Sequence, residues 1–157
     1  MILEQLIVSF IASTGFAILF NVPRKSLWQC GSVGMLGWII YVILARSFDI
    51  NIVIATLIAA IFVGILSQIF AKWFRTPIIV FNIAGIIPLV PGGLAYETMS
   101  LLVVNEYDSA IAAAVTVLML SGAIALGLVV SEIANQMIRN NHWRKYHNAF
   151  DRKGVTR

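Results

Sequence analysis

Apolar residues fill five long runs of the chain, and short polar or proline-containing segments separate these runs. A run of about 17 to 25 mostly apolar residues is long enough to cross the hydrocarbon core of a bilayer as a helix. The pattern therefore predicts an all-α membrane protein with five transmembrane helices in a single domain, 1–157. The predicted spans are residues 2–20, 27–45, 52–71, 78–104 and 110–130.

The segment after the fifth run, residues 131–157, is polar but keeps apolar residues at helical spacing. Ile133, Met137 and Ile138 recur beside Asn135 and Arg139. We expect the fifth helix to continue out of the bilayer as an amphipathic cytoplasmic tail, with Trp143 and Tyr146 at the level of the lipid headgroups.

The fourth run contains 27 residues, or about 40 Å of continuous helix, which is more than a crossing requires. Pro88 and Pro91 each remove an amide donor and displace the carbonyl four residues earlier. Gly92 and Gly93 permit backbone conformations that other residues avoid. The sequence therefore predicts a broken fourth helix, with the break at residues 88–93.

A break inside a membrane frees backbone amides and carbonyls, which are tolerated only where protein buries them or a wet cavity accepts them. Secondary transporters use such discontinuous helices as substrate and ion sites. A simple packing kink is the alternative. Two prolines and two glycines within six residues favour a site.

Three polar residues near the break are further candidates. Glu97 either exchanges a proton during transport or lies at the membrane interface. Asn82 either binds substrate or makes a hydrogen bond between helices. Tyr96 lies next to Glu97 on the same segment.

Composition supports a membrane location, since 60% of residues are hydrophobic, 11% are charged and the mean hydropathy is +0.91. Soluble domains carry about 25% charged residues. The net charge of +4 does not indicate nucleic-acid binding, because the basic residues lie between the apolar runs.

The distribution of charge predicts the orientation. With the N-terminus outside and the C-terminus inside, ten of the eleven Lys and Arg residues are cytoplasmic, and only Arg46 is not. The alternative is a re-entrant hairpin at Pro88 to Gly93. The charge distribution disfavours the orientation that such a hairpin would impose on the chain, but it does not exclude a hairpin at this place.

Small residues in two spans indicate close helix contacts. Gly31, Gly34 and Gly37 form one strip of the second span, and Ala123 and Gly127 form a pair in the fifth. At the start of the fourth run, we expect Thr76 to cap the helix.

Enzyme activity and metal binding find little support. Cys30 is the only cysteine, and His142 and His147 are five residues apart without an acidic cluster nearby. No nucleophile elbow, Walker loop or dinucleotide fingerprint is present, so we expect neither a metal nor a cofactor.

Two motifs carry a family resemblance: residues 20–24, Phe-Asn-Val-Pro-Arg, and residues 87–93, Ile-Pro-Leu-Val-Pro-Gly-Gly, followed by Tyr96. They resemble the small subunit of the split threonine/serine exporter family (the YjjB-like type). Pro88, Pro91, Gly92 and Tyr96 match the family motif, whereas Glu97 stands where other members have a neutral residue.

The resemblance implies a bacterial inner-membrane exporter whose other half is a larger subunit of the same family. It implies threonine and serine as substrates, or dicarboxylates such as succinate in some split pairs. Because the number of spans is odd, a similar half fused ahead of this one would have the opposite orientation. Such inverted repeats are typical of alternating access, which is therefore the expected mechanism around the broken helix. Two alternatives stay open: a structural or assembly membrane protein without transport, and a homo-oligomeric pore.

Overall fold

A computed structural model describes the backbone of residues 2–154 and the side chains of residues 3–137. The described chain is helical throughout and contains no strand. Its α-helices are α1 (Ile2–Leu19), α2 (Leu27–Val42), α3 (Ile52–Phe74), α4 (Ile78–Ile86), α5 (Gly92–Val103) and α6 (Tyr107–Gly154). Short turns of 3-10 helix occupy Arg24–Ser26 and Ile87–Leu89, and a π-helical turn at Ile43–Ser47 extends α2. The all-α prediction is confirmed.

Three helices end in the same way, with one residue in the left-handed region. Asn21, Arg75 and Asn105 have φ of 55°, 50° and 62°. The following amide bonds to a carbonyl five residues back, at 3.0 to 3.2 Å, in each case: Val22 to Ala17, Thr76 to Ala71 and Glu106 to Leu101. This is the Schellman arrangement, which satisfies carbonyls at the end of a helix.

The predicted cap at Thr76 is wrong. The Thr76 hydroxyl donates to the Phe74 carbonyl at 3.2 Å, and no side chain caps α4, which begins after Pro77. Thr76 belongs to the closing turn of α3, so its hydroxyl is directed backward along the chain.

Three described helices are long and apolar enough to cross a membrane: Arg24–Ser47, Ile52–Phe74 and Tyr107–Met137. The bent pair Ile78–Leu89 and Gly92–Val103 makes a fourth if it counts as one span. The apolar helix Leu3–Leu19 is shorter. The chain is therefore a multi-pass helical protein, whereas the five-span count and the N-out orientation stay predictions.

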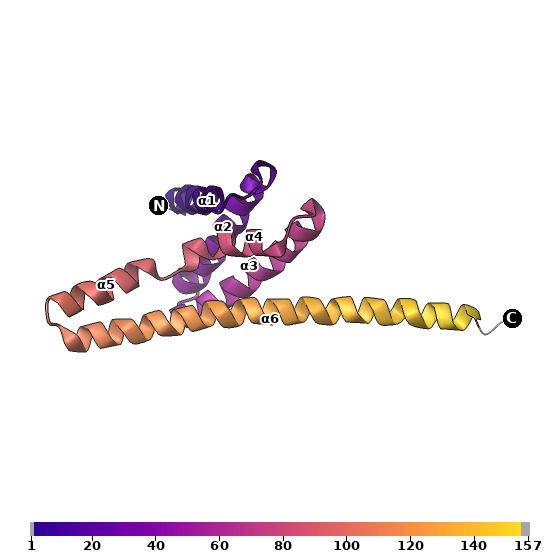
Figure 1. The fold of residues 1–157 in the computed structure, drawn as a ribbon. Helices are drawn as coiled ribbons and strands as arrows, with labels where there is room; N and C mark the ends of the chain where they lie inside the picture. Colours follow the sequence, from indigo (N-terminus) through magenta and orange to yellow (C-terminus); the bar gives the residue numbers. More distant parts are fainter. Residues whose placement is uncertain (1, 155–157) are drawn as a thin grey trace.

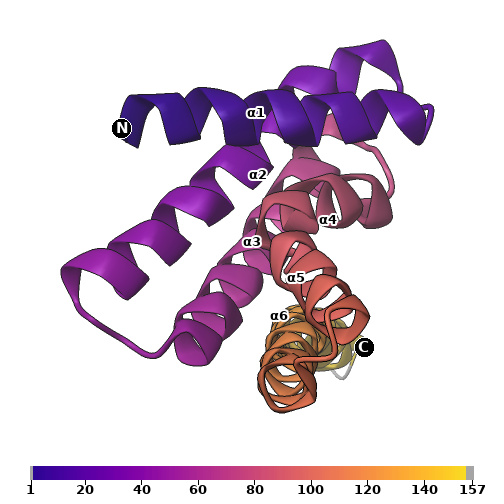
Figure 2. The ribbon, with the colours of Figure 1, turned by 90° about the vertical axis from the view of Figure 1, so that its left-hand side faces the viewer.

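The fourth run is broken where the sequence predicts, and the two halves meet at a bend of 51°. A hairpin would reverse the chain direction, whereas α5 continues away from α4 (Figure 1). The helix that follows, α6, then runs back along α5 and packs beside it (Figures 1 and 2).

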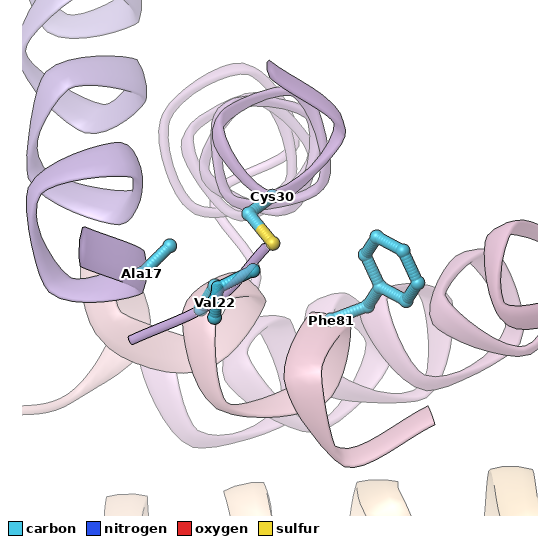
Figure 3. Packing of buried hydrophobic residues seen from close by; sticks show 5 residues of the cluster. Ala17, Val22, Cys30 and Phe81 are labelled. Atoms are coloured by element: carbon cyan, nitrogen blue, oxygen red, sulfur yellow. The ribbon is translucent and has the colours of Figure 1, made fainter. Parts of the chain in front are cut away.

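The helices α1 to α4 form the packed part of the molecule. One apolar cluster fills the space between the end of α1, the start of α2 and α4, and Figure 3 shows its members Ala17, Val22, Cys30 and Phe81. A second cluster joins α2, α3 and α6 to Leu89 at the break: Val33, Ala59, Val63, Leu89 and Ile124.

Small residues permit these close contacts, as predicted. A methyl group added at Gly34 would strike Ser13 of α1, and one added at Gly37 would strike Val63 of α3. At Gly127 of α6 it would lie 2.7 Å from the Ala60 Cβ and 2.9 Å from the Leu57 carbonyl oxygen. Gly34 and Gly37 of α2 and Gly127 of α6 therefore serve helix packing.

The longest helix, α6, crosses the bundle on α3. Gln68 of α3 donates from Nε2 to the Ser131 carbonyl at 2.9 Å, and Lys72 Nζ donates to Asn135 Oδ1 at 3.2 Å. Both residue pairs are 63 positions apart, so α3 and α6 advance in the same sense. As Figures 1 and 2 together show, α1 lies crosswise to α6.

The tail was predicted to be an amphipathic helix with Trp143 and Tyr146 at the headgroups. The backbone of α6 does continue without interruption to Gly154. The side chains of Trp143, Tyr146, His142 and His147 lie outside the described residues.

Candidate functional site

The backbone of the break consists of two residues between helical segments. Val90 is extended, with φ of −64° and ψ of 127°, and Pro91 has φ of −77° and ψ of 53°. The Gly92 amide donates to the Val90 carbonyl at 2.8 Å, which closes an inverse γ-turn centred on Pro91. The helix α5 then begins at Gly92.

No side chain caps the start of α5. In the first turn of a helix the amides have no acceptor within the helix, and they carry the positive end of its dipole. The amides of Gly93 and Leu94 occupy this turn. The break therefore presents an end of a helix that attracts negative charge.

A cavity of about 230 Å³ adjoins this end of α5. Residues of four helices and of the break line it: Trp38, Tyr41, Thr56, Pro88, Leu89, Val90, Pro91, Gly93, Leu94 and Leu120. Apolar side chains dominate the wall, and the lining residues with a polar side-chain group are Trp38, Tyr41 and Thr56. A mostly apolar cavity with a few convergent polar groups is typical of a site for a small molecule.

A second cavity, of about 300 Å³, lies on the α1 side of the break. Its lining residues are Glu4, Gln5, Val8, Ser9, Ala12, Trp38 and Pro88. Trp38 and Pro88 line both cavities, so the two cavities adjoin at these residues.

The structure brings three of the predicted site residues to the first cavity: Pro88, Pro91 and Gly93. Gly92 is exposed and lines neither cavity. Neither glycine has a positive φ, and a methyl group added at either would meet nothing within 4 Å. The break therefore does not use the positive-φ backbone conformations that made Gly92 and Gly93 candidates in the sequence.

Two other predicted residues lie away from the cavities. Tyr96 is 78% exposed, and Glu97 is exposed on the outer side of α5. Neither lines a described cavity near the break. Within the described chain, α5 packs mainly against α6, so these side chains face away from the bundle.

Asn82 lies half-buried on α4, four residues before Ile86. Its Oδ1 atom is buried and accepts no hydrogen bond from any described residue. This oxygen therefore does not make the hydrogen bond between helices that was the alternative explanation of Asn82. Asn82 does not line either cavity.

The sequence analysis missed the three lining residues of the first cavity that carry a polar side-chain group: Trp38 and Tyr41 of α2 and Thr56 of α3. The rings of Trp38 and Tyr41 lie in contact, tilted by 36°, with centroids 5.2 Å apart. Thr56 is 2% exposed and donates to the Ile52 carbonyl at 2.7 Å. A hydroxyl inside an otherwise apolar span was the available signal, but the sequence does not show which spans face the break.

Comparison with known proteins connects this site to a family. The family model for the threonine/serine exporter ThrE matches residues 5–134, which include the break and all lining residues of the first cavity. No solved structure matches the chain. The match covers more than half of the sequence, and its members are transporters rather than enzymes. The chain thus belongs to the threonine/serine exporter family and is a multi-pass membrane protein of amino acid export.

Proposed function

We propose that the chain is one subunit of a secondary exporter and that the cavity at the break holds the exported metabolite. The preferred substrates are threonine and serine. A dicarboxylate such as succinate is the second candidate, since it presents the same carboxylate group to the site.

The start of α5 at the cavity is the observation that carries this proposal. A carboxylate placed at the amides of Gly93 and Leu94 would receive hydrogen bonds and a favourable helix dipole. The hydroxyls of Tyr41 and Thr56 offer partners for the other polar groups of an amino acid, and Trp38 offers an apolar surface. Half-helix ends bind substrate carboxylates in this way in other transporters.

The two cavities suggest how access would alternate. They adjoin at Trp38 and Pro88, and α5 packs mainly against α6. A rocking motion of α5 and the first half of α6 about the bend would open one cavity while it closes the other. Rigid movement of one element pair around a fixed site is the common form of alternating access.

A larger subunit of the same family is the proposed partner, in the inner membrane of a bacterium, with assembly of several copies as the second possibility. Exposed polar residues on a membrane-spanning segment require a protein partner or a wet pathway. Tyr96 and Glu97 are exposed on α5. We propose that these residues face the partner or the pathway between the halves.

Export from cells that contain both subunits tests the proposal. We compare Gly93→Leu, which would place a side chain at the cavity, with Gly122→Leu, where an added methyl group also meets nothing within 4 Å. Gly93→Leu should abolish most threonine efflux at unchanged membrane abundance, and Gly122→Leu should not. Equal efflux in both variants would exclude this cavity, and a purely structural protein would show no efflux in any of them.

A further inference from the structure

A third cavity, of about 170 Å³, lies between the end of α1 and the first half of α4. Its seven lining residues are all apolar. Phe20 and Ile79 of this lining are 57% and 59% exposed, whereas Ala17 and Ala84 are buried. The cavity is therefore a hollow that opens on the outer surface of the bundle and reaches inward to the apolar cluster of Figure 3.

Two loops meet at the end of the bundle where this cavity lies. The hydroxyl oxygens of Ser26, in the loop between α1 and α2, and Thr76, in the loop between α3 and α4, lie 3.5 Å apart. Both loops adjoin the third cavity. The first loop contributes Phe20 and Val22 to the lining, and Ile79 lines the cavity three residues after Thr76. The cavity and the two loops therefore form one continuous surface.

The two loops carry positive charge without negative charge beside it. Arg24 and Lys25 belong to the first loop and Arg75 to the second, and all three are exposed. Residues 20–29 and 70–79 contain neither Asp nor Glu. None of the three basic side chains makes a hydrogen bond or an ion pair with a residue whose side chain the structure describes. This surface therefore attracts an anion, and its positive charge is not neutralised by nearby loop residues.

Two exposed tryptophans indicate the depth of this surface in a membrane. Trp28 lies in the first turn of α2 and Trp73 in the last turn of α3, next to the two loops. Tryptophan is enriched where the hydrocarbon core meets the lipid headgroups. The basic loops are therefore expected at the level of the headgroups. The third cavity, between the adjoining helices, is expected at the level of the acyl chains.

We propose that this surface binds an anionic phospholipid, with an acyl chain in the third cavity and the phosphate group against Arg24, Lys25 and Arg75. Guanidinium groups bind phosphate oxygens through paired, charge-assisted hydrogen bonds. Basic pockets between membrane helices bind anionic headgroups on the cytoplasmic side, which is where the predicted orientation places these loops. A phospholipid fits better than a soluble anion, because it also fills the apolar cavity.

Lys72 is not assigned to the phosphate group, although it lies near the second loop. Its Nζ atom donates to Asn135 Oδ1 of α6 at 3.2 Å. Glu132 lies one turn before Asn135 on the same helix and provides negative charge in that direction. The lipid site does not depend on the proposed export function, since it uses neither the break nor the first cavity.

Lipid binding to the purified full-length chain in a neutral detergent tests the proposal. The chain is titrated with phosphatidylglycerol or with phosphatidylcholine of the same acyl chains. Native mass spectrometry measures the lipid retained, and thermal melting measures the stabilisation. Phosphatidylglycerol should bind saturably and about tenfold or more tighter than phosphatidylcholine. Arg75→Ala should weaken its binding by about fivefold, and Arg24→Ala combined with Arg75→Ala by about twentyfold.

Matched variants separate the site from general effects of charge and size. Arg46→Ala removes an exposed arginine beyond the other end of α2 and should leave the affinity for phosphatidylglycerol unchanged. Ile83→Trp fills the third cavity and should weaken binding, whereas Ile111→Trp places the same side chain on the exposed surface of α6 and should not. Variants that melt at the unmodified temperature without added lipid are folded.

The proposal is overturned if phosphatidylglycerol and phosphatidylcholine bind equally, or if Arg46→Ala weakens binding as much as Arg75→Ala. Displacement of the lipid by an equal concentration of glycerol 3-phosphate would also overturn it, because the site would then recognise a soluble anion. Unchanged affinity in Ile83→Trp would refute the placement of the acyl chain in the third cavity. A chain that binds the lipid but supports no efflux would refute the export function and leave the lipid site standing.

Discussion

The two halves of the broken helix differ both in composition and in surroundings, since α4 is almost wholly apolar and α5 contains several polar residues. In α4, the residues Phe81, Ala84 and Gly85 are buried among α1, α2 and α3, whereas no residue of α5 is buried. A methyl group added at Gly85 would lie 2.6 Å from a Val33 methyl and 2.7 Å from a Val63 methyl. One added at Gly92 or Gly93 would meet nothing within 4 Å.

This difference assigns separate roles to the two halves. The first half, α4, is fixed by side-chain packing against α1, α2 and α3. The second half, α5, is held mainly by α6 and begins at the candidate substrate cavity. The packed side of the break is therefore α4, and α5 is the side that is free to move or to contact a partner.

The largest expected effect is on stability, and it separates the glycines of the two halves. Gly85→Leu should lower the free energy of unfolding by about 3 kcal/mol or more, because the core must move to admit the side chain. Gly92→Leu should change it by less than about 0.5 kcal/mol, as for a surface substitution. Thermal melting of both variants in the same detergent measures the difference. Equal melting temperatures would show that α4 is not the packed half.

The next effect concerns substrate affinity at the first cavity. Tyr41→Phe removes the hydroxyl of a residue that lines the cavity and should raise the Kd for threonine by about three- to tenfold, the value of one hydrogen bond. Tyr107→Phe is the control, since its hydroxyl bonds to Asn105 Oδ1 in the loop before α6, at 2.8 Å. Isothermal titration of the purified complex measures both. An affinity loss confined to Tyr107→Phe would move the site to the loop.

A smaller effect tests the packing of α6 on α3. Gln68→Ala removes the hydrogen bond from α3 to the Ser131 carbonyl and should cost about 1 kcal/mol, in the range for bonds between membrane helices. Gln136→Ala removes an exposed side chain of α6 and should cost less than about 0.5 kcal/mol. Denaturant-induced unfolding of both variants in mixed micelles makes the comparison. A larger loss for Gln136→Ala would contradict the packing of α3 on α6.

The smallest effect is expected at Glu97. Because Glu97 lines neither cavity, Glu97→Gln should leave the KM for threonine within about twofold. Efflux recorded between pH 6 and pH 8 tests its candidate role in proton coupling, since the amide cannot exchange a proton at any of these values. Retained pH dependence would remove Glu97 from that role, and a lost pH dependence would assign proton coupling to α5.

Much of the helical framework could be predicted from the sequence. Apolar run length and proline position are local properties, and they located the helices and the break at Pro88 and Pro91. The close contacts at Gly34 and Gly127 followed from their spacing. The end of α3 was harder to predict, because Arg75 adopts a left-handed conformation that its residue type rarely takes.

The lining of the site depends on contacts between distant segments, and hydropathy carries little information about these. Trp38 and Thr56 lie inside long apolar runs of the sequence, and they reach the break because α2 and α3 pack beside it. Glu97 and Tyr96 lie close to the break along the chain, but α5 turns them outward. The rotation of a helix inside an apolar environment is set by packing partners, which a single sequence does not display.

Protection of a cysteine at the break tests the central claim most directly. In a Cys30→Ala background, Gly93→Cys places a thiol at the first cavity, and Gly122→Cys places one on the open side of α6. A small charged thiol reagent is applied to the purified complex with and without threonine. We predict that threonine slows labelling of the Gly93→Cys variant and leaves the Gly122→Cys variant unchanged. Labelling of the Gly93→Cys variant that neither threonine, serine nor succinate slows would contradict a substrate site at the broken helix.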